Sequence, residues 1–206
     1  LARLSPSPLA TFDTCPRRFF FAHVLKVGGR RLESAPMRMH NAVQAVVDEL
    51  TARPDRTPDE SEMRSIIDAA WAAHGPTEHG YATEYRQISD ELLNFFFQLR
   101  QGERRRVPQS LSLRFEDAEV VVTAHEQIDT DHSTVFRRIR TGRKTSTALD
   151  ALDAAAFQIA ADGRGEAEFV YLTGSDQDRL SMSEGKIKTR KKKIADAAIS
   201  IIEGRF

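Results

Sequence analysis

The sequence lacks three features that would place a chain outside the reducing interior of a cell. It has a single cysteine, Cys15, so no internal disulfide can form. It has no run of about eighteen apolar residues, and its first residues show neither the charged nor the apolar stretch of a secretion signal. We therefore expect a soluble, cytoplasmic protein with no membrane contact.

The chain also lacks net charge, because 30 Lys and Arg residues balance 30 Asp and Glu residues. This balance removes the simplest argument for a nucleic-acid partner. The charge is spread unevenly, however, since residues 1–40 carry seven basic against two acidic residues, and residues 41–100 carry five against eleven. Further positive charge gathers at 104–106, 137–144 and 186–193. Local basic patches therefore survive the neutral total.

The apolar spacing predicts helices first and strands later. Ser7 before Pro8 predicts the start of the first helix, and Gly28-Gly29 the end of the second. Period-3.6 spacing predicts further helices, and period-2 alternation predicts strands. The expected helices cover about 9–14, 16–27, 36–50, 59–74, 83–101, 147–162 and 184–203, and the expected strands 111–116, 120–128, 133–140, 167–174 and 178–183. This order predicts an α/β (α+β) fold, with one sheet spanning residues 111–182.

A chain of 206 residues can form one domain with a buried core. We expect a single domain over 1–206, with a mainly helical lobe over 1–105 and a sheet-containing core over 106–206. We also expect it to be a piece of a larger protein.

The strand predicted over 133–140 carries arginine where a buried strand would carry valine. Arg137, Arg138 and Arg140 precede an expected turn at Thr141-Gly142, and Arg138 and Arg140 share one parity. Such charge indicates a grip on phosphate, an enzyme site that has lost its acid, or an edge strand protected by charge.

The chain resembles the RecB-like branch of the PD-(D/E)XK nucleases, found at the end of superfamily 1 DNA helicases and in AddB-type proteins. The resemblance rests on five features in the family's order. They are "LSPSPLATFDTCPRRFFFAHVLKV", His40, "VVTAHEQID", "RIRTG" and "AAFQIA". It implies a restriction-endonuclease-like central mixed sheet flanked by helices, an N-terminal helical lobe, and work on DNA ends.

The departures from the family pattern concern its metal site. The metal-binding aspartate falls on Glu126 or, with another gap, on Gln127, while Arg138 and Arg140 replace the motif's acid and lysine. Pro36 and Ala124 replace two glycines, and Asp162 replaces the tyrosine after Gln158. Arginine is permanently cationic and cannot ligate a divalent metal. We therefore predict no Mg²⁺ binding, no hydrolysis, and a remnant site in which Glu126, Arg138 and Arg140 lie near one another, with His40 and Gln158 as its other members.

Three functional hypotheses follow. The leading one is a catalytically inactive domain that binds or guides DNA, expected to be single-stranded, for an attached or partner helicase in DNA repair or recombination. The expected DNA contacts are Arg17, Arg18, Arg137, Arg138, Arg140, Arg143 and Lys144. The second is an Mg²⁺- or Mn²⁺-dependent DNA exonuclease with a shifted site built from His40, Glu126, Asp129 and Lys144. The third is a structural interaction module that does not touch DNA.

Cys15 has two readings. In a subset of the resembled family, the cysteine at this position is the first ligand of a four-cysteine iron–sulfur cluster, whose other ligands follow the last helix. One cysteine cannot hold such a cluster, so the resemblance implies one only for a longer chain. In this chain we expect Cys15 to be a small buried residue beside Pro16, with no cofactor.

Overall fold

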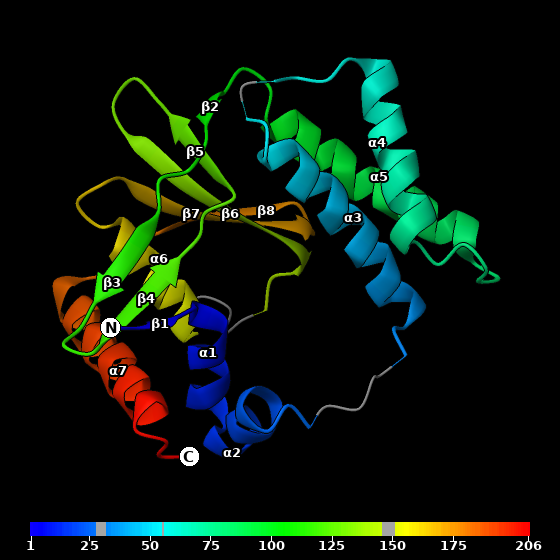
Figure 1. Ribbon diagram of the computed structural model, residues 1–206. Helices are drawn as coiled ribbons and strands as arrows, with labels where there is room; N and C mark the ends of the chain where they lie inside the picture. Colours follow the sequence, from blue (N-terminus) through cyan, green and yellow to red (C-terminus); the bar gives the residue numbers. More distant parts are fainter. Residues whose placement is uncertain (28–31, 55, 146–150) are drawn as a thin grey trace.

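The computed structural model describes residues 1–27, 32–54, 56–145 and 151–206 (Figure 1). Its helices are α1 (Pro6–Thr14), α2 (Pro16–Phe19), the π-helix η1 (Phe20–Val24), α3 (Ala35–Thr51), α4 (Glu60–His74), α5 (Ala82–Leu99), α6 (Leu152–Ala161) and α7 (Glu184–Ile202). Its strands are β1 (Ala2–Leu4), β2 (Arg104–Arg106), β3 (Leu111–Arg114), β4 (Ala118–Val122), β5 (Glu126–Asp129), β6 (Thr134–Arg143), β7 (Glu166–Thr173) and β8 (Asp176–Leu180). Mixed sheets flanked by helices confirm the predicted restriction-endonuclease-like α/β class.

The strands form two sheets. The larger has the order β2-β5-β6-β7-β8, with β6 and β7 parallel and the other neighbours antiparallel. The smaller has the order β1-β4-β3, with β1 parallel to β4. Gly165 allows β7 to start beside β6, because a Cβ there would lie 2.2 Å from the carbonyl oxygen of Thr134. The arginine-bearing strand β6 is thus the central strand of the larger sheet.

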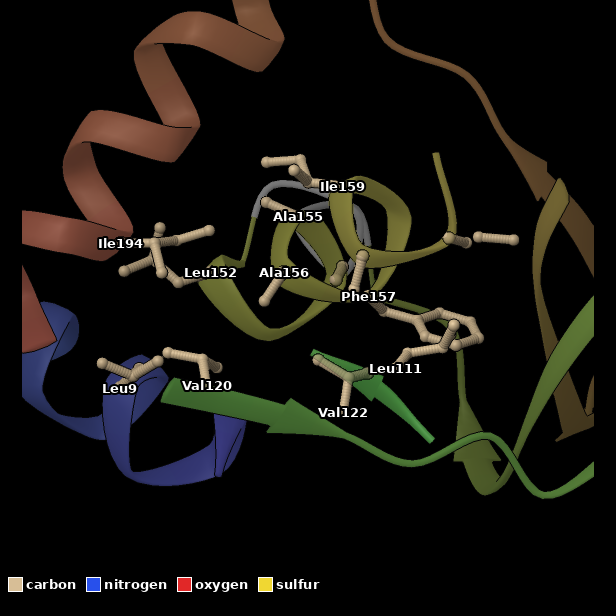
Figure 2. Packing of buried hydrophobic residues seen from close by; sticks show 14 of the residues in the cluster. Leu9, Leu111, Val120, Val122, Leu152, Ala155, Ala156, Phe157, Ile159 and Ile194 are labelled. Carbon is tan, nitrogen blue, oxygen red and sulfur yellow. The ribbon is translucent and has the colours of Figure 1, made fainter. Parts of the chain in front are cut away.

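One face of the larger sheet packs against α6. Side chains alternate along a strand, so Phe136, Phe169 and Tyr171 share this face. Helix α6 is rich in alanine and buried on almost every side, and it packs against β3, β4, β7, α1 and α7. Figure 2 shows α6 above the strands of the smaller sheet, with α7 and α1 to one side of it. The core residues labelled there are Leu9, Leu111, Val120, Val122, Leu152, Ala155, Ala156, Phe157, Ile159 and Ile194.

The opposite face packs against α3 and α5. Ile139, Val170 and Leu172 point to this side and join a second core with apolar residues of the two helices. On α3 the buried residues follow the spacing expected from the sequence, namely Met39, Val43, Val46, Val47 and Leu50. Helix α4 then covers α3 (Figure 1). The larger sheet therefore lies between two separate cores.

The prediction of one sheet is wrong. The expected strand 120–128 is two strands in different sheets, because β4 ends at Val122 and β5 begins at Glu126. The period-2 alternation continues without interruption across 120–128, so the sequence carries no sign of this break. Strands β1 and β2 were missed because each has three residues and depends on pairing with β4 or β5 rather than on a pattern of its own.

Several element ends also differ from the prediction. The first helix has Ser5 as N-cap and Pro6 in its first turn, two residues before the expected pair. Thr141 and Gly142 lie within β6, whose pairing with β7 shifts register between Arg140 and Arg143, so no turn ends the strand there. The expected stop at Gly28-Gly29 and residues 147–150 of an expected helix lie outside the described residues.

None of the helices in the described ranges is long and apolar enough to cross a membrane.

Candidate functional site

The alternation of β6 divides its arginines between the two faces of the larger sheet. Arg137 lies opposite Glu126 on β5 and beside Glu168 on β7, so these three residues share the face that packs on α3 and α5. Arg138 and Arg140 lie opposite Phe169 and Tyr171 and share the face that packs on α6. Adjacent arginines therefore occupy different environments.

Arg137 is buried in a cluster of carboxylates. Its side chain is 3% exposed, and its guanidinium nitrogens lie 2.7 Å from Glu103 Oε1, 2.5 Å from Glu168 Oε2 and 3.3 Å from Glu126 Oε2. Burial alone would lower the pKa of Arg137, but the hydrogen bonds it donates to Glu103 and Glu168 and the charges of these residues raise it. Arg137 is thus a permanently charged group within the fold.

Glu126 belongs to the same cluster. It is fully buried, and its Oε1 lies 2.7 Å from Arg100 Nε as an ion pair, without the alignment of a hydrogen bond. Arg100 also donates a hydrogen bond of 3.1 Å to the Leu50 carbonyl oxygen, which ties β5 to the ends of α3 and α5. Burial lowers the pKa of Arg100, and the charge of Glu126 opposes this shift. The cluster therefore connects the sheet to the helical layer.

The structure corrects two expectations for these residues. Glu126 does not lie with Arg138 and Arg140, because the β5–β6 register places it on the other face. Arg137 is enclosed by three glutamates and does not present its guanidinium to a DNA phosphate. The residues of β5 that share the face of Arg138 and Arg140 are Gln127 and Asp129, of which Gln127 lies closer to the arginines along the strand. Gln127 lies opposite Phe136 and accepts a hydrogen bond of 3.0 Å from the Gln109 backbone N–H.

Among the described residues, Arg138 forms no ion pair with a carboxylate. Its guanidinium carbon lies 5.6 Å from the Phe157 ring centroid and 5.8 Å from that of Phe169. Its Nε and Nη1 atoms are buried, and neither has a hydrogen-bond partner within the described chain. Burial lowers the pKa of Arg138, and the nearby charge of Arg140 lowers it further, against a weaker opposing effect of Asp153.

Arg140 is held by α6 and by the aromatic floor of the sheet. It forms an ion pair with Asp153, and its guanidinium carbon lies 4.6 Å from the Phe169 ring centroid and 6.0 Å from that of Tyr171. Its side chain remains 33% exposed. Asp153 and Phe157 are four residues apart on α6, so both reach the same strand. This helical spacing could have identified Asp153 from the sequence.

His125 ends the pairing of β5 with β6. Its backbone N–H donates a hydrogen bond of 2.8 Å to the Arg137 carbonyl oxygen, and its Nδ1 accepts a hydrogen bond of 2.7 Å from the Ile139 backbone N–H. Burial lowers the pKa of His125, as do the charges of Arg138 and Arg140, while Asp48 opposes them. The His125 imidazole thus accepts the hydrogen bond of a β6 backbone N–H that lies between Arg138 and Arg140.

Beyond His125, β6 meets α3 at a cavity of about 510 Å³. Gln44 of α3 lines it together with Arg140, Arg143 and Tyr171. The Tyr171 hydroxyl is buried and has no hydrogen-bond partner in the described chain, and burial raises its pKa. One turn before Gln44, His40 is partly buried with an unpartnered Nδ1, and burial lowers its pKa.

The remaining predicted residues lie in different surroundings. Arg143 is exposed, whereas Lys144 forms an ion pair of 2.8 Å with Asp178 of β8, and its hydrogen bond to that carboxylate raises the pKa of Lys144. Gln158 lines a separate cavity beside Arg179 and α7, so it is not part of the surface around Arg138.

The two arginines near the N-terminus that were predicted to contact DNA lie on α2. Arg17 and Arg18 are exposed there, next to the aromatic contact between Phe19 and Phe206. Cys15 is partly buried, and its Sγ accepts a hydrogen bond of 3.4 Å from the Arg18 backbone N–H. In this position the thiol caps α2.

The donor set does not fit a divalent metal. Within the described ranges, no three His, Cys, Asp or Glu residues come together in a group that could hold one. The shifted site does not assemble, because buried Glu126 pairs with Arg100 and Arg137, Asp129 pairs with Arg106 at 2.6 Å and Lys144 pairs with Asp178. Asp153, which reaches the face of Arg138 and Arg140 from α6, pairs with Arg140.

Comparisons with known proteins place the chain in a family. A sequence model of the PD-(D/E)XK nuclease superfamily matches residues 3–188. No curated protein matches the chain. Among solved structures, the chain is similar to one titled "Crystal structure of SSO0001", with a TM-score of 0.37 and 12% identity over 90% of this chain and 82% of that chain. Because the superfamily match covers most of its length, this chain belongs to the PD-(D/E)XK nuclease superfamily.

Proposed function

We propose that this domain binds DNA without cleaving it, on behalf of an attached or partner helicase in DNA repair or recombination. The observation that carries the proposal is the partly exposed Arg138 beside Arg140, held over two aromatic rings, with Nε and Nη1 atoms that have no hydrogen-bond partner among the described residues. We call Arg138, Arg140 and Arg143 the arginine surface. The helicase connection rests on the resemblance of "LSPSPLATFDTCPRRFFFAHVLKV" and the motifs that follow it to helicase-associated nucleases.

The chemistry of Arg138 favours an oxyanion ligand. Two buried N–H donors without acceptors cost free energy, and a guanidinium presents its donors in the fork that matches phosphate. Arg140 shares its charge with Asp153, but its partly exposed side chain can reach a second phosphate oxygen. Arg143 is exposed farther along the strand and extends the positive surface.

The same residues argue against hydrolysis. A two-metal nuclease needs carboxylates that hold cations against the scissile phosphate. Here the face of Gln127 presents two fixed cations, which attract phosphate but repel Mg²⁺. The surface is therefore suited to bind the DNA backbone but not to hydrolyse it.

Salt-dependent DNA binding tests the proposal. Fluorescence anisotropy with a labelled single-stranded oligonucleotide is measured for the parent and for Arg138→Ala/Arg140→Ala at several salt concentrations. We expect weaker binding and a salt slope flatter by about one to two units, because each lost phosphate contact removes about 0.7. Arg114→Ala is the matched control, since Arg114 is 79% exposed on the smaller sheet. Equal affinity and equal slope in parent and double variant would favour the interaction module instead.

A second measurement tests the absence of chemistry. Calorimetry with Mn²⁺ and a time course on linear DNA with Mg²⁺ or Mn²⁺ should show neither saturable metal binding nor cleavage. Cleavage that copurifies with the parent and is lost in Arg138→Ala/Arg140→Ala would overturn the inactive assignment and support the exonuclease.

A further inference from the structure

The segment Pro16–Val27, here called the α2–η1 segment, exposes several large apolar side chains between residues 21 and 27. Its π-helix η1 buries none of its residues. Phe21, Val24 and Leu25 are 44%, 46% and 50% exposed, and Val27 is 66% exposed. Contiguous exposed apolar surface of this kind marks a binding site more often than chance.

The exposed ring of Phe21 rests on a cluster of other aromatic rings. Phe19 is buried, and its centroid lies 5.7 Å from that of Phe206 in a stacked arrangement. Phe20 lies 5.2 Å from Phe206 and 5.8 Å from Phe21, which it meets edge to face. Aromatic pairs in this geometry restrain one another. Phe21 is therefore presented at the surface by a packed base and not by a free loop.

The charges within this segment are all positive. Residues 16–27 contain Arg17, Arg18 and Lys26 and no acidic residue. All three cations are exposed, and none forms an ion pair within the described chain. Lys26 has a φ of 52°, which lies in the left-handed region. The Val27 backbone N–H donates a hydrogen bond of 2.9 Å to the Phe21 carbonyl oxygen and so closes the turn. A position that favours glycine thus carries a cation.

We infer that the α2–η1 segment is a second nucleic-acid site, in which an unpaired base stacks on Phe21 while Arg17, Arg18 and Lys26 contact the flanking phosphates. An exposed aromatic ring among cations is the composition of single-strand binding surfaces, and every base has a face that can stack. The absence of carboxylates in residues 16–27 favours a polyanion over a protein partner. The inference rests on the proposed DNA binding and specifies it, because bases in a duplex do not offer free faces.

Removal of the Phe21 ring tests the stacking. Binding of a 15-mer of deoxythymidylate and of an abasic oligonucleotide of equal length is measured by anisotropy. We expect Phe21→Ala to weaken thymidylate binding by about tenfold and to leave abasic binding unchanged. Phe21→Leu keeps the apolar surface but loses the ring, so it should behave like Phe21→Ala. Tyr81→Ala, which removes a 65% exposed aromatic at the start of α5, is the matched control.

The outcomes separate this inference from the arginine surface. Arg138→Ala/Arg140→Ala should keep the preference for thymidylate over the abasic strand while its salt slope falls. Unchanged thymidylate binding in Phe21→Ala, with circular dichroism matching the parent, overturns the stacking site whatever the arginines do. Loss of self-association in Phe21→Ala, seen by sedimentation without any change in DNA affinity, would identify a protein interface and equally overturn it.

Discussion

Neighbouring arginines on the two faces of β6 have different hydrogen-bond and charge partners. Arg137 points into a cluster where Glu103, Glu126 and Glu168 take up its donors, and its side chain is 3% exposed. Arg138 points to the other face, where it contacts Phe157 and Phe169 and where two of its buried nitrogens have no acceptor in the part of the chain that the structure describes. The residue type and the strand are the same. The difference lies in what the neighbouring strands and helices supply.

This contrast separates a buried arginine with carboxylate partners from the arginine that we propose to bind DNA. A buried charge is tolerated when opposite charges and hydrogen bonds surround it, as they do around Arg137. A buried charge without partners is retained against its own cost and therefore points to a ligand that completes it. Positive charge in a sequence does not by itself distinguish the two cases.

The largest expected effect comes from breaking the Arg137 cluster. Arg137→Met preserves much of the side-chain volume but leaves the glutamates without their shared cation, so we expect a loss of about 3–5 kcal/mol in the free energy of unfolding. Urea denaturation measures it. Adding Glu168→Gln to the variant should recover part of the loss, because one of the carboxylates that lost Arg137 is then neutral, while Glu126 keeps its ion pair with Arg100. A loss below about 1 kcal/mol in Arg137→Met would show that the two faces do not differ as described.

The next largest expected effect is a pH dependence of the free energy of unfolding that comes from His125. The pKa of His125 is lowered in the folded chain, so the unfolded chain binds more protons near its ordinary value of 6.5. Stability should therefore fall as pH drops below about 6.5, by at most about 1.4 kcal/mol per pH unit for this histidine, until the folded pKa is passed. His125→Asn keeps an acceptor for the Ile139 N–H and should flatten the decline, while His40, whose pKa is also lowered, sustains the remainder. Thermal unfolding between pH 5 and 7.5 measures both.

The smallest expected effect is on stability at Arg138. Arg138→Met replaces an unpartnered guanidinium on Phe157 and Phe169 with an apolar side chain that also packs on rings. We expect the free energy of unfolding to stay unchanged or to rise by about 1 kcal/mol, even though DNA binding falls. The control is Arg114→Met, an exposed arginine of β3 in the smaller sheet. Destabilisation of Arg138→Met to the level of Arg137→Met would assign Arg138 a structural role.

Much of the fold could be predicted from local pattern. The helical spacing of α3 and α5 and the range of α7, expected over about 184–203, were evident in the sequence. These features depend on residues close together along the chain. The two-sheet division was not evident, because the break between Val122 and Glu126 depends on which strand each half pairs with. Strands β1 and β2 were invisible for the same reason.

The candidate site divides along the same line. The sequence by itself determined that Arg138 and Arg140 share a face and that Arg137 does not, because alternation is a local property of a strand. It also determined that no acid and lysine stand at these positions. Only the tertiary structure decided that Glu126 faces Arg137 while Gln127 faces the other way, and that Asp153 reaches Arg140 from α6. The physical reason is register: a slip of one residue between β5 and β6 exchanges every side chain between the two faces, and long-range pairing, not local sequence, sets that register.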